Sequence, residues 1–174
     1  MIASDLKIKH HVISISLPWK GSALLDSTIA IPEGRSTQEM NASIPSTYVP
    51  ARNTIFLALA ASCAEAEGAD TLMIGANVLD YSGYPDCRPE FLNAFMNVIS
   101  KGTKAGAEGK TISIEAPLLK LNKAEIIQLA VSLKVPIEKT WSCYKGGENP
   151  CGECDSCRLR QKGFEEAKLA EVRK

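Results

Sequence analysis

The stretch WSCYKGGENPCGECDSCRLR, residues 141–160, decides how the C-terminal part of this chain folds. It places four of the six cysteines of the chain within fifteen residues, at Cys143, Cys151, Cys154 and Cys157. The spacing is C-x7-C-x2-C-x2-C, and a C-x2-C pair on a tight turn brings two thiolates to one metal ion. Four thiolates make a closed tetrahedral zinc site that has no open position for a substrate. The spacing therefore predicts a structural Zn²⁺ site that folds the segment around it.

Two other interpretations of the cysteines are weaker. Iron–sulfur clusters also use closely spaced cysteines, and the run from Cys151 is similar to a ferredoxin triplet. No fourth cysteine followed by proline comes after that run, which favours zinc. Redox-active or disulfide-bonded thiols are disfavoured because the N-terminus, MIASDLKIKHH, lacks the apolar region of a signal peptide.

Length and charge limit the class of protein. The chain has 174 residues, and its 20 basic residues balance its 20 acidic ones, so the net charge is zero. This balance argues against a general binder of nucleic acid or membrane surfaces, which would need excess Lys and Arg. No apolar run approaches the roughly 18 residues that span a bilayer. We expect a single-domain cytoplasmic protein.

Apolar patterns along the chain alternate between strands and helices. Strands are predicted at 11–19, 70–77 and 110–118, and helices at 50–69, 88–102, 121–135 and 157–174. Pro50 is expected at the first position of its helix and Gly68 at its end, whereas Gly163 is expected to interrupt a mostly exposed last helix. Residues 20–50 are expected to form a long loop. The alternation predicts an α/β fold with a mostly parallel sheet.

Two polar segments are candidates for a binding site. One is TYVPARN, residues 47–53, and the other is NVLDYSGYPDCRPEF, residues 77–91, directly after a predicted strand. Ligands of parallel sheets bind at the carboxyl ends of strands, where the second segment falls. Its carboxylates, phenols and guanidinium could bind a planar hydrogen-bonding ligand or a phosphate–metal unit. The plain alternative is a helix cap and a solvated turn.

Four motifs in order carry a resemblance to a known family. TYVPARN (47–53), DYSGYPDCRPEF (80–91), PLLKLNKAEII (117–127) and TWSCYKGGENPCGECDSCRLR (140–160) together closely resemble 7-cyano-7-deazaguanine synthases, from about residue 8 to residue 168. The resemblance implies an adenine nucleotide α-hydrolase-like domain over residues 1–140 and a zinc-binding segment over 141–174. It also implies a ligase of queuosine biosynthesis. Such an enzyme uses ATP with Mg²⁺ to convert 7-carboxy-7-deazaguanine and ammonia to the nitrile through adenylated intermediates.

The resemblance also assigns residues and partners. The four cysteines match the zinc ligands of the family. The catalytic candidates are Asp80, Asp86 and Arg88, and the candidates for substrate or nucleotide binding are Arg52, Asn53, Tyr81, Ser82 and Tyr84. Cys87 is expected to have no role as a nucleophile. Family members commonly pair, so a homodimer is expected.

One family feature is absent from this sequence. Family members carry an N-terminal phosphate loop of the form SGGxDS, and no such string occurs in the 174 residues. Such a loop would bind the pyrophosphate of ATP through backbone N–H groups, so we expect the chain to be inactive alone. A gene fragment, an internal start and one part of a split enzyme with a separate phosphate-loop fragment all fit this pattern. The alternative from another class is a non-catalytic zinc-binding module that interacts with RNA.

Overall fold

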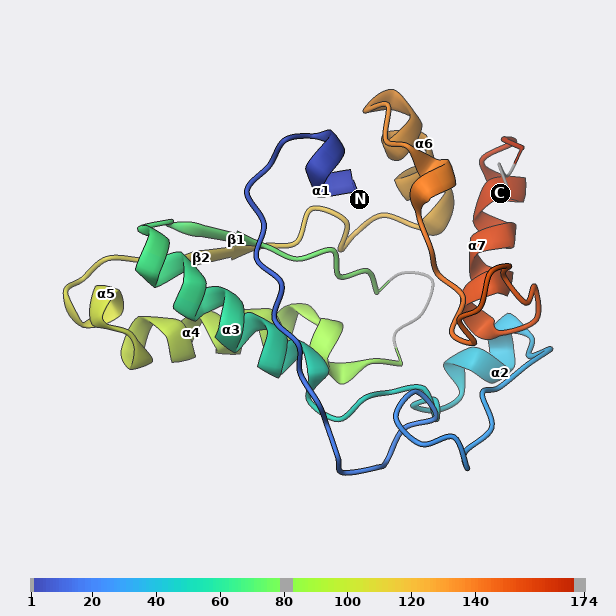
Figure 1. Ribbon diagram of the computed structural model, residues 1–174, viewed down its shortest axis with the longest axis horizontal. Helices are drawn as coiled ribbons and strands as arrows, with labels where there is room; N and C mark the ends of the chain where they lie inside the picture. Colours follow the sequence, from blue (N-terminus) through green and yellow to red (C-terminus); the bar gives the residue numbers. More distant parts are fainter. Residues whose placement is uncertain (1, 79–82, 171–174) are drawn as a thin grey trace. The chain divides into compact units, whose positions relative to one another are not determined.

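The structure is a computed structural model that describes residues 2–78 and 83–170 (Figure 1). The chain divides into two compact units. Unit 1 comprises Met1–Ser36, Ser46–Tyr48 and Lys123–Lys174, and unit 2 comprises Thr37–Pro45 and Val49–Asn122. In sequence, unit 2 therefore lies between the N-terminal and C-terminal parts of unit 1, and Ser46–Tyr48 of unit 1 separates its two segments.

Unit 2 contains a small parallel sheet. Strand β1 (Thr71–Met73) pairs with β2 (Ser113–Glu115), with Thr71 opposite Ser113. Both strands lie inside predicted ranges, and their parallel pairing confirms an α/β fold with a parallel sheet. Figure 1 shows the helices α3 (Arg52–Glu67) and α4 (Pro89–Gly102) beside this sheet. Helix α3 packs on β1, and α4 packs on β2.

The interior of unit 2 is apolar. Side chains from α3, α4 and the residue before β2 form one buried cluster, made of Leu57, Ala61, Ala64, Leu92, Phe95, Ile99 and Ile112. The cluster explains why both helices form where the apolar pattern predicts them, because each buries its apolar side against the other and against the sheet.

The ends of α3 confirm one prediction and correct another. Gly68 ends the helix with φ at 72°, a left-handed conformation that glycine adopts without strain. The helix begins at Arg52, so the prediction that Pro50 occupies its first position is wrong. Arg52 N–H closes a turn on the carbonyl of Val49, and Ala51 has φ at 53°, so the chain becomes helical only after this turn.

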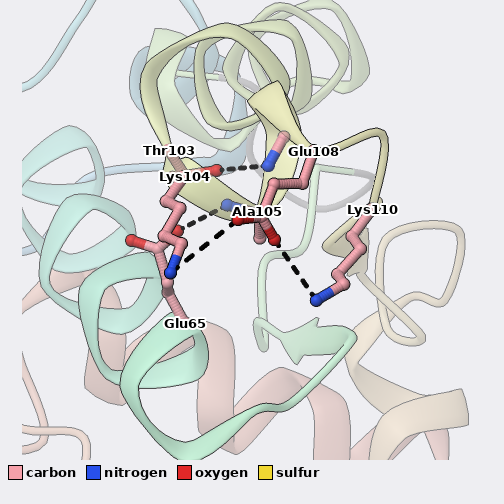
Figure 2. Close-up of polar contacts among 7 residues, drawn as sticks. Glu65, Thr103, Lys104, Ala105, Glu108 and Lys110 are labelled. Carbon is pink, nitrogen blue, oxygen red and sulfur yellow. Dashed lines mark hydrogen bonds and ion pairs between the residues drawn. The ribbon is translucent and has the colours of Figure 1, made fainter.

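The connection from α4 to β2 is fixed to α3 by polar contacts (Figure 2). The short helix α5 (Lys104–Ala107) starts with Ala105 N–H donating to the Glu65 carboxylate at 2.8 Å. Gly106 N–H donates to Thr103 Oγ1 at 3.0 Å. These bonds satisfy N–H groups that the first turn of a helix leaves without intrahelical partners.

Unit 1 contains α1 (Ile2–Asp5), α6 (Lys123–Ser132), the 3₁₀-helix η2 (Ile137–Lys139) and α7 (Asp155–Glu166). Helices α6 and α7 pack against each other.

Gly163 allows this close packing within α7. A Cβ atom at Gly163 would lie 2.7 Å from Lys123 Cβ and 3.0 Å from Ile127 Cδ1. The prediction that Gly163 interrupts this helix is wrong, because α7 continues through Gly163 to Glu166 and the missing side chain leaves room for α6. The prediction of a mostly exposed last helix is confirmed for the described residues 157–170, most of which are exposed, although Cys157, Gly163 and Phe164 are buried.

The strand predicted over 11–19 is wrong, whereas the loop predicted over 20–50 is mostly confirmed. Residues 11–19 alternate in polarity, but they form no strand, and Val12 and Ile13 are 77% and 59% exposed. Within the described residues no other strand pairs with this segment, and a strand without a partner leaves its backbone groups without ladder hydrogen bonds. The predicted loop over 20–50 is mostly irregular but includes the short helix α2 (Thr37–Asn41). Among the described residues, no helix has both the length and the apolar character to span a bilayer.

Candidate functional site

The four clustered cysteines converge in unit 1. Their Sγ atoms all lie within 4.8 Å of one another, and Cys151 Sγ is 3.9 Å from Cys157 Sγ. Sulfur atoms at ~2.3 Å from a tetrahedral zinc ion are about 3.8 Å apart, so this spacing suits one shared ion. Cys143, Cys154 and Cys157 are buried, and Cys151 is half-buried. The predicted convergence is confirmed, and the four thiols can hold a metal ion.

Loop backbone and N–H groups shape this cysteine cluster. Gly146, Gly147 and Gly152 have φ at 67°, 86° and 78°, which turns the chain where most residues would be strained. Cys151 N–H donates to Cys143 Sγ, and Cys154 N–H donates to Cys151 Sγ, both at 3.4 Å. Such bonds favour the charged thiolate that binds metal.

The thiols of the cluster differ in their acidity. Burial acts to raise the pKa of Cys151, but N–H groups of Cys154 and Glu153 outweigh it and lower this pKa to about 7. Burial raises the pKa of Cys157 to about 12. Binding of a metal ion near neutral pH must therefore displace the proton of Cys157.

A second segment of unit 1, residues 33–35, is attached to the cysteine cluster. Glu33 forms an antiparallel bridge with Cys154, and Gly34 N–H donates to the carbonyl of Glu153 at 3.1 Å. Lys145 forms an ion pair with Glu33, and its hydrogen bond holds the pKa of that carboxyl below its usual range. The sequence pattern carried no signal for this attachment.

Arg35 and Asp155 complete this attachment. The Arg35 guanidinium contacts both carboxylate oxygens of Asp155, and the Nε to Oδ1 distance is 3.1 Å. The two side chains are 20% and 8% exposed, so the pair is largely removed from water. Asp155 is the first residue of α7, where a negative charge also suits the helix dipole.

The two polar segments predicted to form a binding site meet in unit 2. Asn53 N–H donates to Asp86 Oδ2 at 3.0 Å, and Asn53 Nδ2 donates to the Asp86 carbonyl at 2.9 Å. Both residues are buried. Asp86 lies in the 3₁₀-helix η1 (Pro85–Cys87), and Arg88 follows it as an exposed residue before α4. Asp80, Tyr81 and Ser82 lie outside the described residues.

Arg52 and Tyr84 lie next to this pair. The Cζ atom of Arg52 is 5.9 Å from the centre of the Tyr84 ring, within the range of a cation–π contact. Arg52 Nε is buried and has no hydrogen-bond partner among the described residues.

Cys87 is part of the same cluster. Its Sγ accepts a hydrogen bond from Asn53 Nδ2 at 3.3 Å. Burial raises the pKa of the Cys87 thiol, and the charge of Asp86 adds to this effect. A protonated thiol is a poor nucleophile, which agrees with the expectation that Cys87 has no such role.

Asn77, which follows β1, was not singled out by the sequence pattern. Its side-chain amide donates to the carbonyl of Leu121. The bond attaches the segment after β1 to the segment after β2, at the carboxyl ends of both strands.

The fold and the cysteine cluster together define the class of this chain: an α/β protein with a parallel sheet and a C-terminal segment whose four cysteines could hold a metal ion. Comparison with protein families narrows the class. The family model described as "Queuosine biosynthesis protein QueC" matches residues 1–168. The chain belongs to this family.

Curated relatives agree with the family match. The chain is 56% identical over 165 residues to the 7-cyano-7-deazaguanine synthase of Trichodesmium erythraeum. The aligned region covers 94% of this chain and 74% of the relative. It is 55% identical over 164 residues to the synthase of Nostoc punctiforme, and this aligned region covers 94% of this chain and 73% of that relative. The resemblance predicted from the four motifs is confirmed.

Proposed function

We propose that this chain takes part in the ATP-dependent conversion of 7-carboxy-7-deazaguanine and ammonia to 7-cyano-7-deazaguanine in queuosine biosynthesis. The family match and the names of the relatives support the product. The observation on the chain itself that carries the proposal is the meeting of two motifs of the family. Asn53 and Asp86, 33 residues apart, bond to each other and bring the two motifs together beside the sheet.

The proposed reaction needs two activations. A carboxylate is a poor acyl donor, so ATP first adenylates it and pyrophosphate leaves. Ammonia then attacks the acyl carbon, AMP leaves, and the primary amide forms. A second ATP adenylates the amide oxygen and releases pyrophosphate, and loss of AMP together with two protons from nitrogen gives the nitrile. Each step places developing negative charge on phosphate oxygens, which cationic side chains and Mg²⁺ would stabilise.

The residue roles follow from the family motifs. Arg52, Asn53, Tyr81, Ser82 and Tyr84 are proposed to bind substrate or nucleotide, and Asp80 and Arg88 to act in catalysis. The resemblance assigns Asp86 to catalysis with them, but its two bonds to Asn53 favour a positioning role. The four cysteines are proposed to hold a structural Zn²⁺.

The remaining parts of the proposal concern organisation. Residues 1–140 are proposed as the adenine nucleotide α-hydrolase-like part, and residues 141–174 as the zinc-binding segment. A phosphate loop is proposed to be supplied from outside these 174 residues, because its motif does not occur in them. A homodimer in the cytoplasm completes the proposal.

The test measures nitrile formation directly. The zinc-loaded protein is incubated with 7-carboxy-7-deazaguanine, ammonium, ATP and MgCl₂, and the product is identified by mass spectrometry. Parallel reactions contain a phosphate-loop segment from a family member, and the full-length Trichodesmium relative serves as the positive control. We expect nitrile only when the segment is added.

Two outcomes would change the proposal. Nitrile formation by the chain alone would contradict the need for a separate segment. No nitrile in any mixture, while the positive control is active, would contradict the function. Submicromolar RNA binding at physiological salt would then favour the RNA-binding module instead.

A further inference from the structure

Helix α3 lacks an N-cap side chain of its own. Ala51 precedes the helix and has no side-chain acceptor for the N–H groups of the first turn. Asp86 supplies the acceptor from a distant part of the sequence, because its Oδ2 accepts Asn53 N–H at 3.0 Å. Asn53 returns a bond from Nδ2 to the Asp86 carbonyl at 2.9 Å. At 7% and 5% exposure, Asn53 and Asp86 are shielded from water.

This reciprocal pair also fixes the neighbours of both residues. Arg52 directly precedes Asn53, and Tyr84 is two residues before Asp86. The guanidinium of Arg52 lies over the Tyr84 ring, with Cζ at 5.9 Å from its centre. The Asn53–Asp86 bonds therefore fix the backbone next to Arg52 and the backbone next to Tyr84, the two residues of this contact.

Arg52 has an unused donor at this place. Its Nε is buried and finds no hydrogen-bond acceptor among the described residues. A buried cationic donor without an acceptor loses the hydration it has in water, so an anionic oxygen that reached it would be bound favourably.

We propose that Asp86 and Asn53 are a positioning pair that holds Arg52 against Tyr84, and that Arg52 binds an anionic oxygen of a substrate. The oxygen belongs to a carboxylate or to a phosphate, which have this chemistry in common. Asp86 is then a positioning residue that acts through Arg52, not a catalytic residue. The proposed function is used only to choose the substrates for the test.

The first arm of the test identifies the anion. Binding of 7-carboxy-7-deazaguanine and of Mg²⁺–ATP is measured separately by calorimetry for the wild type, Arg52→Ala, Arg52→Lys and the control Lys101→Ala. Lys101 is an exposed cation of α4 in the same unit. We expect Arg52→Ala to weaken one ligand by about 10- to 100-fold, as for a lost charge-assisted hydrogen bond. Arg52→Lys should keep part of that affinity, and Lys101→Ala should match the wild type.

The ligand that loses affinity assigns the oxygen. Weaker binding of the acid alone indicates a carboxylate, and weaker binding of ATP alone indicates a phosphate. A wild type that binds neither ligand, an Arg52→Ala variant within about twofold of the wild type for both, or equal losses for both would overturn the proposal.

The second arm tests the positioning role of Asp86. Asp86→Ala removes the acceptor for Asn53 N–H, whereas Asp86→Asn keeps an oxygen in the same place and removes the charge. We expect Asp86→Ala to weaken the same ligand that Arg52→Ala weakens, and Asp86→Asn to restore most of that loss. Glu90→Gln, an exposed acid in the first turn of α4, serves as the control.

A double variant separates positioning from general loss of structure. If Asp86 acts through Arg52, then Arg52→Ala with Asp86→Ala should bind no more weakly than Arg52→Ala alone. Additive losses, or a folded Asp86→Asn that binds as poorly as Asp86→Ala, would overturn the positioning role.

The proposal and the proposed function fail separately. Nitrile formation together with ligand binding that does not depend on Arg52 would contradict the role proposed for Arg52 and support the proposed function. Arg52-dependent binding without nitrile would do the reverse.

Discussion

The interior of unit 1 and the interior of unit 2 are stabilised by different chemistry. The main buried cluster of unit 2 is made of side chains such as Leu57, Phe95 and Ile99. The cluster around the metal-binding segment of unit 1 is made of Cys143, Cys154 and Cys157, with Ile31, Tyr144 and Cys151 packed against it. Unit 2 can fold by removing apolar surface from water, whereas the cysteine segment of unit 1 offers four thiols that could be joined by a metal ion.

The magnitudes of the two effects support this difference. Burial of one large apolar side chain stabilises a fold by about 1.5–3 kcal/mol. A cluster of small cysteine side chains offers less apolar area, and its thiols gain little until they share a ligand. A structural zinc ion contributes about 10–16 kcal/mol of apparent binding free energy to the segment that holds it.

The largest predicted effect follows from removal of the metal. Cys154→Ser, or a strong zinc chelator, should remove hydrogen-exchange protection from residues 143–166, because the segment loses its ~10–16 kcal/mol of metal binding. Protection in α3 and α4 should persist. Hydrogen-exchange mass spectrometry and elemental analysis of zinc measure the two quantities.

Cys63→Ser is the matched control, because Cys63 is exposed and lies outside the cysteine cluster. It should keep its zinc and its protection. Equal loss of protection in both units on chelation would show that the two units do not differ in this way.

The next effect concerns the apolar core of unit 2. Phe95→Ala should lower the free energy of unfolding of unit 2 by about 3–5 kcal/mol, because it leaves a cavity among buried side chains. Zinc content should stay unchanged. Denaturant unfolding followed by circular dichroism gives the free energy. Val98→Ala, an exposed site on the same helix, should change it by no more than about 0.5 kcal/mol.

A smaller effect is expected at the Arg35–Asp155 ion pair. Arg35→Ala leaves the largely buried Asp155 carboxylate without its bidentate partner, and should cost about 2 kcal/mol of zinc affinity. Competition with a chromophoric chelator measures the affinity. Lys20→Ala removes the exposed cation that pairs with the buried Asp26 in the same unit, and because Asp26 Oδ1 keeps its hydrogen bonds from Thr28, the change should cost less than ~1 kcal/mol. Similar losses for the two variants would contradict the attachment of the segment around Arg35 to the cysteine segment.

The smallest effect is a change of zinc affinity with pH. Cys157, with its pKa raised to about 12, is protonated in the metal-free protein throughout the neutral range and releases a proton on binding at any pH below that value. Cys151, with its pKa lowered to about 7, releases a further proton only when the pH falls below about 7. Affinity should therefore rise with pH, with an added loss approaching ~1.4 kcal/mol per pH unit below 7.

Calorimetry in buffers of different ionisation enthalpy gives the number of protons released. More protons should be released at pH 6 than at pH 8, because a thiol with its pKa lowered to about 7 is mostly protonated at the lower pH and mostly ionised at the higher one. Equal release at the two pH values would contradict the assignment to Cys151.

Local patterns predicted most of unit 2. The helices from Arg52 and Pro89 and the two strands have strong apolar patterns, and Gly68 marks a helix end by a rule that depends on one residue. Alternation in residues 11–19 predicted a strand wrongly, because a strand also needs a neighbour that a local pattern does not provide. Gly163 was misread for a similar reason, since its role depends on contact with Lys123 and Ile127.

The candidate sites show the same difference between features set by local sequence and features set by contacts between distant residues. The cysteine spacing alone predicted that four thiols would meet, because their ligand geometry is local. The Asn53–Asp86 bonds join residues 33 positions apart, and the Arg35–Asp155 pair joins residues 120 positions apart. No short motif encodes such pairs. The sequence therefore indicated which loops matter, but not that Asp86 is engaged with the start of α3.

The position of unit 2 between the two ends of unit 1 in the sequence has a consequence for synthesis. The ribosome releases residues up to Asn122 before any of the four clustered cysteines, so α3, α4 and both strands can pack while translation continues. The first 36 residues must wait for α6 and α7 before their own unit can assemble. During that interval the side chain of Ile31, which packs against the cysteine cluster in the folded unit, is open to chaperones and to other nascent chains, so the supply of the proposed zinc ion at the end of translation should affect yield.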